Sequence, residues 1–90
     1  ESALLNRGMS YMKLSKYEEA INDFSQVLRY NNKSTQAHLN RASCYEALKK
    51  TSSAIQDFNQ VLDYDPDNAD CLRMRADLFV SNKDYSRALA

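Results

Sequence analysis

The chain repeats itself at a distance of 34 residues. Residues 3–30 read ALLNRGMSYMKLSKYEEAINDFSQVLRY, and residues 37–64 read AHLNRASCYEALKKTSSAIQDFNQVLDY. A third, weaker copy begins near Ala69 and keeps Arg75, Ala76 and Phe79 in register. A fixed period of this size is typical of stacked supersecondary units, each of which leans on its neighbours. The functional question is therefore what the surface of such an array binds.

The apolar residues within each copy follow helical spacing. In residues 17–28 they are separated by steps of three and one, which places them in one stripe on a helix. The chain has one Gly and one Pro, so turn residues are few. We predict an all-α solenoid of antiparallel helix–turn–helix pairs, with helices at about 2–14, 18–30, 36–48, 52–64, 70–82 and from 86 onward.

Polar residues near the predicted ends suggest how the helices start and stop. Asn31 and Asn32 can end the second helix in a left-handed conformation. Pro66 disfavours helix at the residue before it and so ends the fourth. Side chains that can cap the next helix follow each end, namely Ser34, then Asp67 or Asn68, and Asp84 for the last helix.

Composition excludes several classes of function. Twelve basic and twelve acidic residues give a formal net charge of zero, which argues against nucleic acid as the main ligand. No apolar run is long enough to span a membrane. No phosphate loop, catalytic constellation or cofactor motif is present, so we expect this segment not to be an enzyme and to hold no cofactor.

The two cysteines carry no metal signature. Cys44 and Cys71 stand 27 residues apart with a single His38, a spacing that fits no zinc site. We expect both thiols to be reduced and buried, and His38 to have a structural or solvent-facing role. Without a disulfide framework, an intracellular, cytoplasmic location is the expectation.

Small and large side chains recur at fixed places in the repeat. Small residues recur at Gly8, Ala42 and Ala76, and again at Ala20, Ala54 and Ala88. Aromatic residues recur beside them, which suggests knobs that fill holes where two helices cross, at Tyr11, Tyr45, Phe79, Phe24 and Phe58. Arginines and aspartates also recur together, and we interpret them as ion pairs within a repeat rather than as a grip on an acidic partner: Arg7, Arg41, Asp23 and Asp57.

This pattern resembles the tetratricopeptide repeat, a 34-residue helix–turn–helix. Gly8, Tyr11, Tyr17, Ala20 and Phe24 fall on the family pattern, and the second copy keeps Ala42, Tyr45, Ala54, Phe58 and Pro66. The chain departs from the pattern at the usual Trp, where Leu4, His38 and Leu72 stand, and at Thr51 and Asn32. We predict repeats at 1–34, 35–68 and 69–90, the third cut within its second helix, in a segment of a longer protein.

The resemblance implies a concave groove lined by the first helix of each repeat. In the family this groove usually binds an extended peptide or a helix of a partner. The positions that correspond to it, and that we expect to contact a partner, are Leu5, Asn6, Met9, Lys13, Leu39, Asn40, Ser43, Arg73, Met74 and Asp77. The same rows also contain Met12, Gln36, Glu46 and Asp70.

Two asparagines in the groove suggest contacts with a peptide backbone. In several family members an Asn at the position of Asn6 and Asn40 holds the partner's main chain, because an amide offers both a donor and an acceptor. Met74 interrupts this series in the third repeat. The alternative is that both asparagines face solvent without a role. Leu5, Met9 and Leu39 would add an adaptable apolar strip, and Lys13, Arg73 and Asp77 would set the charge preference.

One specific family function is not expected. Some members bind the acidic C-termini of heat-shock chaperones through a carboxylate clamp of Lys, Asn and Arg side chains. The matching positions here are Leu5, Met9, Asn40, Asp70 and Met74, and of these only Asn40 agrees. Asp70 would repel a carboxylate.

We therefore expect a protein–protein interaction module that binds another protein, with no nucleic-acid or membrane partner. Two alternatives stay open. The segment can be an architectural spacer or a self-association surface, or it can be the substrate- or partner-recruiting arm of a larger enzyme.

Overall fold

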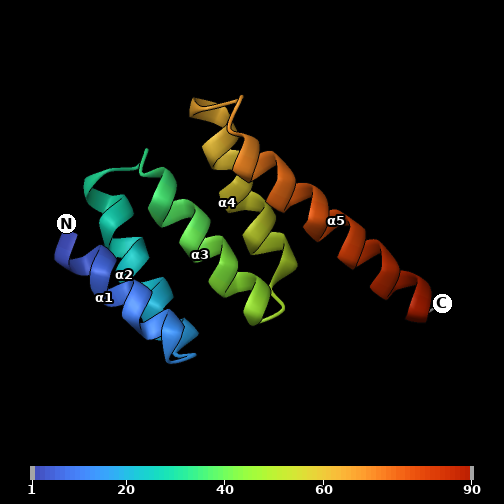
Figure 1. Ribbon diagram of the computed structural model, residues 1–90, viewed down its shortest axis with the longest axis horizontal. Coiled ribbons are helices and arrows are strands. Elements are labelled where there is room, and N and C mark those ends of the chain that lie inside the picture. The colour runs from blue at the N-terminus through green and yellow to red at the C-terminus, as the bar shows by residue number, and fades with distance from the viewer. Residues whose placement is uncertain (1, 90) are drawn as a thin grey trace.

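Five helices make up the computed structural model, which describes the backbone of residues 2–89 and the side chains of residues 3–80. They are α1 (Ser2–Lys13), α2 (Tyr17–Tyr30), α3 (Thr35–Ala47), α4 (Thr51–Tyr64) and α5 (Ala69–Leu89). Figure 1 shows them in sequence along the long axis of the molecule, with each helix packed antiparallel to the next. The predicted all-α fold is confirmed, and α1 to α4 begin and end within a residue of their predicted ranges.

The turn inside each of the first two repeats depends on one left-handed residue. Ser15 has φ 61° and Lys49 has φ 60°. At the first turn the Lys16 N–H donates to the Tyr11 carbonyl at 2.8 Å, and the Ser15 N–H donates to the Met12 carbonyl at 3.0 Å. The second turn repeats both bonds. This pair of bonds is the Schellman arrangement, which satisfies carbonyls at the end of a helix and reverses the chain within three residues.

The connection between repeats differs from the prediction at Asn31. The residue is extended, with φ −142° and ψ 91°, and not left-handed. Its side-chain Oδ1 accepts a hydrogen bond from the Lys33 N–H at 3.2 Å, so the turn is held by the side chain and needs no positive φ. The chain then reaches Ser34, whose Oγ accepts from the Ala37 N–H at 3.3 Å and caps α3.

The equivalent connection after α4 carries a similar cap. Pro66 follows the end of α4 at Tyr64 by two residues. The Asn68 Oδ1 accepts a hydrogen bond from the Cys71 N–H at 2.8 Å and so caps α5.

The third repeat does not contain the predicted second helix. The sequence pattern places a helix end near residue 82 and a new helix from 86, but α5 runs without a break from Ala69 to Leu89. A turn here would place Lys83, the counterpart of Ser15 and Lys49, in the left-handed region, which costs about 1–2 kcal/mol for a non-glycine residue. In the first two repeats the packing of α2 and α4 offsets this cost. The predicted cap by Asp84 and the packing of Ala88 fall on side chains outside the described range.

The core consists of two clusters that follow the repeat. The first is centred on Phe24 and Val27 of α2, and the second on Phe58 and Val61 of α4, all with 0% exposure. Small residues let the helices approach each other. A Cβ added to Gly8 would lie 2.7 Å from Cε1 of Phe24. Ala20, Ala42 and Ala54 are also fully buried, whereas Ala76, predicted to pack in the same way, is exposed.

We predict that Lys49→Gly stabilises the chain. Glycine avoids the cost of a left-handed side-chain residue but loses about 0.5–1 kcal/mol of chain entropy, so the expected gain in the free energy of unfolding is about 0.5–1 kcal/mol. Urea unfolding followed by circular dichroism measures it. Lys50→Gly is the matched control, because Lys50 has φ −96° and gains nothing from glycine. Equal loss of stability in both variants would contradict the prediction.

Candidate functional site

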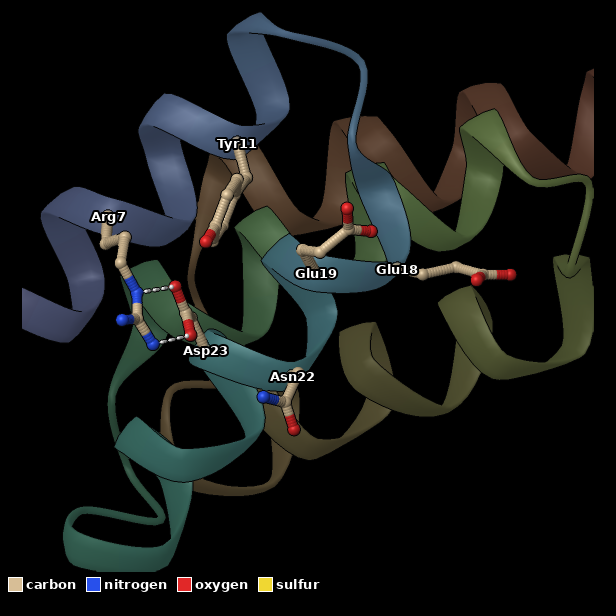
Figure 2. Close-up of a pocket in the computed structure, with 6 residues that line it drawn as sticks. All are labelled: Arg7, Tyr11, Glu18, Glu19, Asn22 and Asp23. Atoms are coloured by element: carbon tan, nitrogen blue, oxygen red, sulfur yellow. Dashed lines mark hydrogen bonds and ion pairs between the residues drawn. The ribbon is translucent and has the colours of Figure 1, made fainter.

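Arg7 and Asp23 form a bidentate ion pair between α1 and α2. The Arg7 Nε and Nη2 donate to the two carboxylate oxygens of Asp23 at 2.8 and 2.7 Å (Figure 2). The guanidinium carbon also lies 5.9 Å from the centre of the Tyr11 ring. Asp23 is only 1% exposed, and such a carboxylate needs a cation or several donors beside it. The hydrogen bonds to Asp23 raise the pKa of Arg7 above its usual value.

Arg41 and Asp57 repeat this pair in a more buried setting. The Arg41 Nε and Nη2 donate to Asp57 at 2.9 and 2.6 Å, and the Arg41 Nη1 donates to the Ser25 Oγ on α2 at 3.1 Å. Arg41 therefore ties α3 both to α4, which follows it, and to α2, which precedes it. Its side chain is 21% exposed, against 57% for Arg7. Neither guanidinium is left available to grip an acidic ligand.

Two surface hollows lie around these ion pairs rather than in the groove. The first, drawn in Figure 2, is lined by Arg7, Tyr11, Glu18, Glu19, Asn22 and Asp23. The second lies over α2, α3 and α4 and includes His38, Arg41 and Asp57 among its lining residues. Because the charged groups in both hollows already satisfy one another, we assign them to structure and not to ligand binding.

His38 has a structural partner that the sequence did not reveal. It is 5% exposed, and its Nδ1 lies 3.0 Å from the hydroxyl of Tyr64 at the end of α4. Burial lowers the pKa of His38, and Arg41 lowers it further while Asp57 opposes the shift. The only hint in the sequence is that His38 occupies a repeat position where Leu4 and Leu72 stand, so a polar side chain there has to find a partner.

The cysteines are inert core residues. Cys44 and Cys71 are both 0% exposed and unpaired. Burial raises the pKa of Cys44 to about 11, which suppresses the reactive thiolate. The Cys71 thiol donates to the Phe58 carbonyl at 3.3 Å. Across the described residues, no group of three His, Cys, Asp or Glu side chains is placed to hold a metal ion.

The predicted groove residues lie on α1, α3 and α5. Leu5 and Met9 are half-buried against the first core cluster, and Leu39 and Met74 against the second. The amide Nε2 of Gln36 contacts the Met9 sulfur at 3.7 Å and so joins α3 to α1. These contacts leave a partly open apolar strip across the first two repeats. The more exposed members of the predicted set are Asn6, Lys13, Arg73 and Asp77, while Ser43 is half-buried.

The two asparagines differ from each other. Asn6 is exposed, as a side chain reaching for a ligand or standing free in solvent would be. Asn40 is half-buried, and its Nδ2 is buried without a hydrogen-bond partner among the described residues. A buried unsatisfied donor of this kind costs about 1–3 kcal/mol. Asn40 is the one polar group on the groove helices that the fold leaves unsatisfied in this way.

The third row brings negative charge to the groove. Burial raises the pKa of Glu46 on α3, and the nearby charge of Asp77 on α5 raises it further. Asp70 lies 3.6 Å from Arg73 in an exposed pair, which leaves Asp70 mostly neutralised at the surface. At this end of the groove the carboxylates of Glu46 and Asp77 are therefore the dominant unpaired charges among the described side chains.

A family model of the tetratricopeptide repeat matches residues 5–63 and, in a second match, residues 49–90. The chain therefore belongs to the tetratricopeptide repeat (TPR) family, a class of helical repeat proteins that serve in general as protein–protein interaction modules. No curated protein sequence matches the chain significantly. None of the five described helices combines the length and apolar character that a membrane crossing requires.

Solved TPR structures share the fold. The first TPR domain of Spaghetti (RPAP3), bound to the HSP90 peptide SRMEEVD, is 25% identical, with a TM-score of 0.81 over 89% of this chain and 64% of that one. The second TPR domain of human RPAP3, in complex with the HSP70 peptide SGPTIEEVD, is 32% identical, with a TM-score of 0.77 over 83% and 62%. A TPR protein from Parabacteroides merdae is 28% identical, with a TM-score of 0.85 over 94% and 33%. The chain spans less than two thirds of each of these structures.

We predict that Asp57→Asn destabilises the chain more than Asp23→Asn. Asp57→Asn leaves the partly buried guanidinium of Arg41 without its counter-charge, which we expect to cost about 2 kcal/mol in the free energy of unfolding. Asp23→Asn leaves Arg7, whose side chain is 57% exposed and can turn to water, so the loss should be smaller. Parallel urea titrations compare the two. A larger loss for Asp23→Asn would mean that the burial of the arginine does not decide the effect.

Proposed function

We propose that this TPR segment binds a peptide or helix of a partner protein in the groove formed by α1, α3 and α5, and that it acts by binding and not by catalysis. Support comes from two structural neighbours that were solved with bound peptides. The ion pairs, the buried histidine and the cysteines of this chain are all engaged within the fold. The groove helices are where unsatisfied polar and apolar groups remain together.

The unpartnered amide of Asn40 is the observation that carries the proposal. An extended peptide presents carbonyl oxygens along its length, and one of them would satisfy the Asn40 Nδ2. The terminal torsion of an Asn side chain is broad, so the amide can turn toward the groove with little strain. Because the free chain leaves this donor unsatisfied, binding would remove a cost and form a hydrogen bond in one step.

The apolar strip beside Asn40 supplies contact area. Leu5, Met9 and Leu39 are each half-buried and so retain surface for a ligand to cover. Methionine is unbranched and changes rotamer easily, which suits side chains of different shape. We infer a ligand with at least one apolar side chain next to the segment whose backbone meets Asn40.

The charges of the groove favour a different ligand from those of the neighbours. The peptides in the RPAP3 structures end in the acidic sequence EEVD. In this chain the clamp positions Leu5, Met9 and Met74 carry no charge, and Glu46 and Asp77 add negative charge nearby. A neutral or basic segment fits this surface better than an acidic one.

We predict that Asn40→Ala weakens peptide binding without weakening the fold. A displayed library of random linear peptides, selected on the chain, supplies ligands whose affinity is then measured by calorimetry. The loss of one hydrogen bond predicts about a tenfold rise in Kd. Stability should be unchanged or slightly higher, because the amide nitrogen makes no hydrogen bond in the free chain. Asn22→Ala, at an exposed position on α2, is the matched control.

Two results would contradict this prediction. Selected peptides that bind the Asn40→Ala variant as tightly as the original chain would place recognition elsewhere. A library that yields no groove-binding peptide would favour the architectural or self-association role.

We also predict that the chain does not bind the acidic peptide SRMEEVD. The groove lacks the lysines and arginine that would hold its carboxylates, and Asp77 and Glu46 would repel them. A titration followed by fluorescence anisotropy should show no saturation at micromolar protein. Saturable micromolar binding would overturn this expectation, and its loss in Asn40→Ala would show that the single matching clamp residue is sufficient.

A further inference from the structure

One face of α5 repeats the surface that α1 and α3 use to hold their following helices. The face consists of Leu72, Ala76 and Phe79, which lie one repeat after His38, Ala42 and Tyr45. In α3, His38 and Ala42 are buried against α4. In α5, Leu72 is 41% exposed, Phe79 is 48% exposed and Ala76 is exposed as well. Figure 1 shows α5 running past α4 with no helix after it.

The arginine of each repeat explains what this face lacks. Arg41 contacts Ser25, sixteen residues before it, and Asp57, sixteen residues after it. Arg75 makes the backward contact in the same way, donating to the Asn59 Oδ1 at 2.8 Å. Its guanidinium also lies 5.9 Å from the centre of the Phe79 ring, as Arg41 lies 5.8 Å from Tyr45.

The forward partner of Arg75 is missing from the described part of the chain. No carboxylate among the described side chains forms an ion pair with it. Asn59 and Phe79 already hold the guanidinium in the orientation that Arg41 uses to bind Asp57. The α5 face is thus an ordered cation beside an apolar surface with a small residue at its centre.

We propose that this face of α5 is the docking site for one amphipathic helix of a partner segment from outside these 90 residues, with an Asp and a Phe adjacent in its sequence. The chain shows the required chemistry twice. In α2 and α4 an alanine precedes such a pair by three residues, as Ala20 precedes Asp23–Phe24 and Ala54 precedes Asp57–Phe58. On α5 the aspartate would pair with Arg75, and the phenylalanine ring would pack on Ala76.

The charge pattern selects this occupant over others. A second copy of the chain offers its own α2 and α4 only if it opens, because Asp23 and Asp57 are already paired and Phe24 and Phe58 are 0% exposed. An extended peptide would not cover the helical stripe formed by Leu72, Ala76 and Phe79. A helix with a carboxylate complements both the apolar stripe and the cation.

The test uses the 90-residue chain and a synthetic helix of known complementarity. The probe is a peptide with the sequence of residues 50–64, KTSSAIQDFNQVLDY, titrated into the isotopically labelled chain and followed by backbone amide NMR. We expect saturable shifts at Leu72, Arg75, Ala76 and Phe79. The peptide with Asp57→Asn should bind about tenfold more weakly, because it loses the charge that faces Arg75. The peptide with Asp63→Asn is the matched control and should bind as before.

A protein variant checks the other side of the contact. Arg75→Gln should weaken binding by a similar factor, whereas Arg73→Gln, on an exposed part of the same helix, should not. Unchanged circular dichroism confirms that both variants fold. The proposal is overturned by an absence of α5 shifts at millimolar peptide, by equal binding of the two peptide variants, or by shifts centred on Ala42, which would mean that the peptide replaces α4. Dimerisation of the chain through α5 in sedimentation would assign the face to a second copy instead. These outcomes are independent of peptide binding in the groove.

Discussion

The closeness of the two helices within a repeat is the constraint on which the other contacts depend. Where α1 crosses α2, the backbone of Gly8 lies against the fully buried ring of Phe24, and an added Cβ would come within 2.7 Å of that ring. This crossing brings the helices near enough for Arg7 to reach both oxygens of Asp23. Ala42 and Phe58 do the same for Arg41 and Asp57. Steric fit therefore sets the geometry, and the ion pair then fixes the register of one helix on the other.

The same arginine also connects neighbouring repeats. Arg41 reaches back to Ser25 while it holds Asp57, so the orientation of the second repeat depends on both contacts. His38 and Tyr64 add a further link across α3 and α4. Because these groups are used up inside the array, the fold assigns its charged and aromatic residues mainly to assembly. What remains for recognition is the outer side of α1, α3 and α5.

The groove illustrates how one fold serves different ligands. The RPAP3 domains share the helical frame with this chain and were solved with peptides that end in EEVD. In this chain, apolar side chains and carboxylates replace the cations that such peptides would need, while the amide of Asn40 is kept. Backbone recognition by an amide depends little on the ligand's side chains, so it can persist when the charge preference changes. The opposite face of α5, with Arg75 and Phe79, adds a second surface of different chemistry.

The sequence by itself determined the architecture, because a period of 34 residues with helical spacing leaves one way to bury every apolar stripe. It also paired the arginines with the aspartates, since both recur at the same interval. The tertiary structure decided what no local pattern encodes. It placed Tyr64 beside His38 across 26 residues, buried the amide of Asn40, and kept α5 helical through the predicted turn at Lys83. Each of these depends on which neighbours are present to fill space or accept a hydrogen bond, and that is settled only when helices distant in the sequence meet.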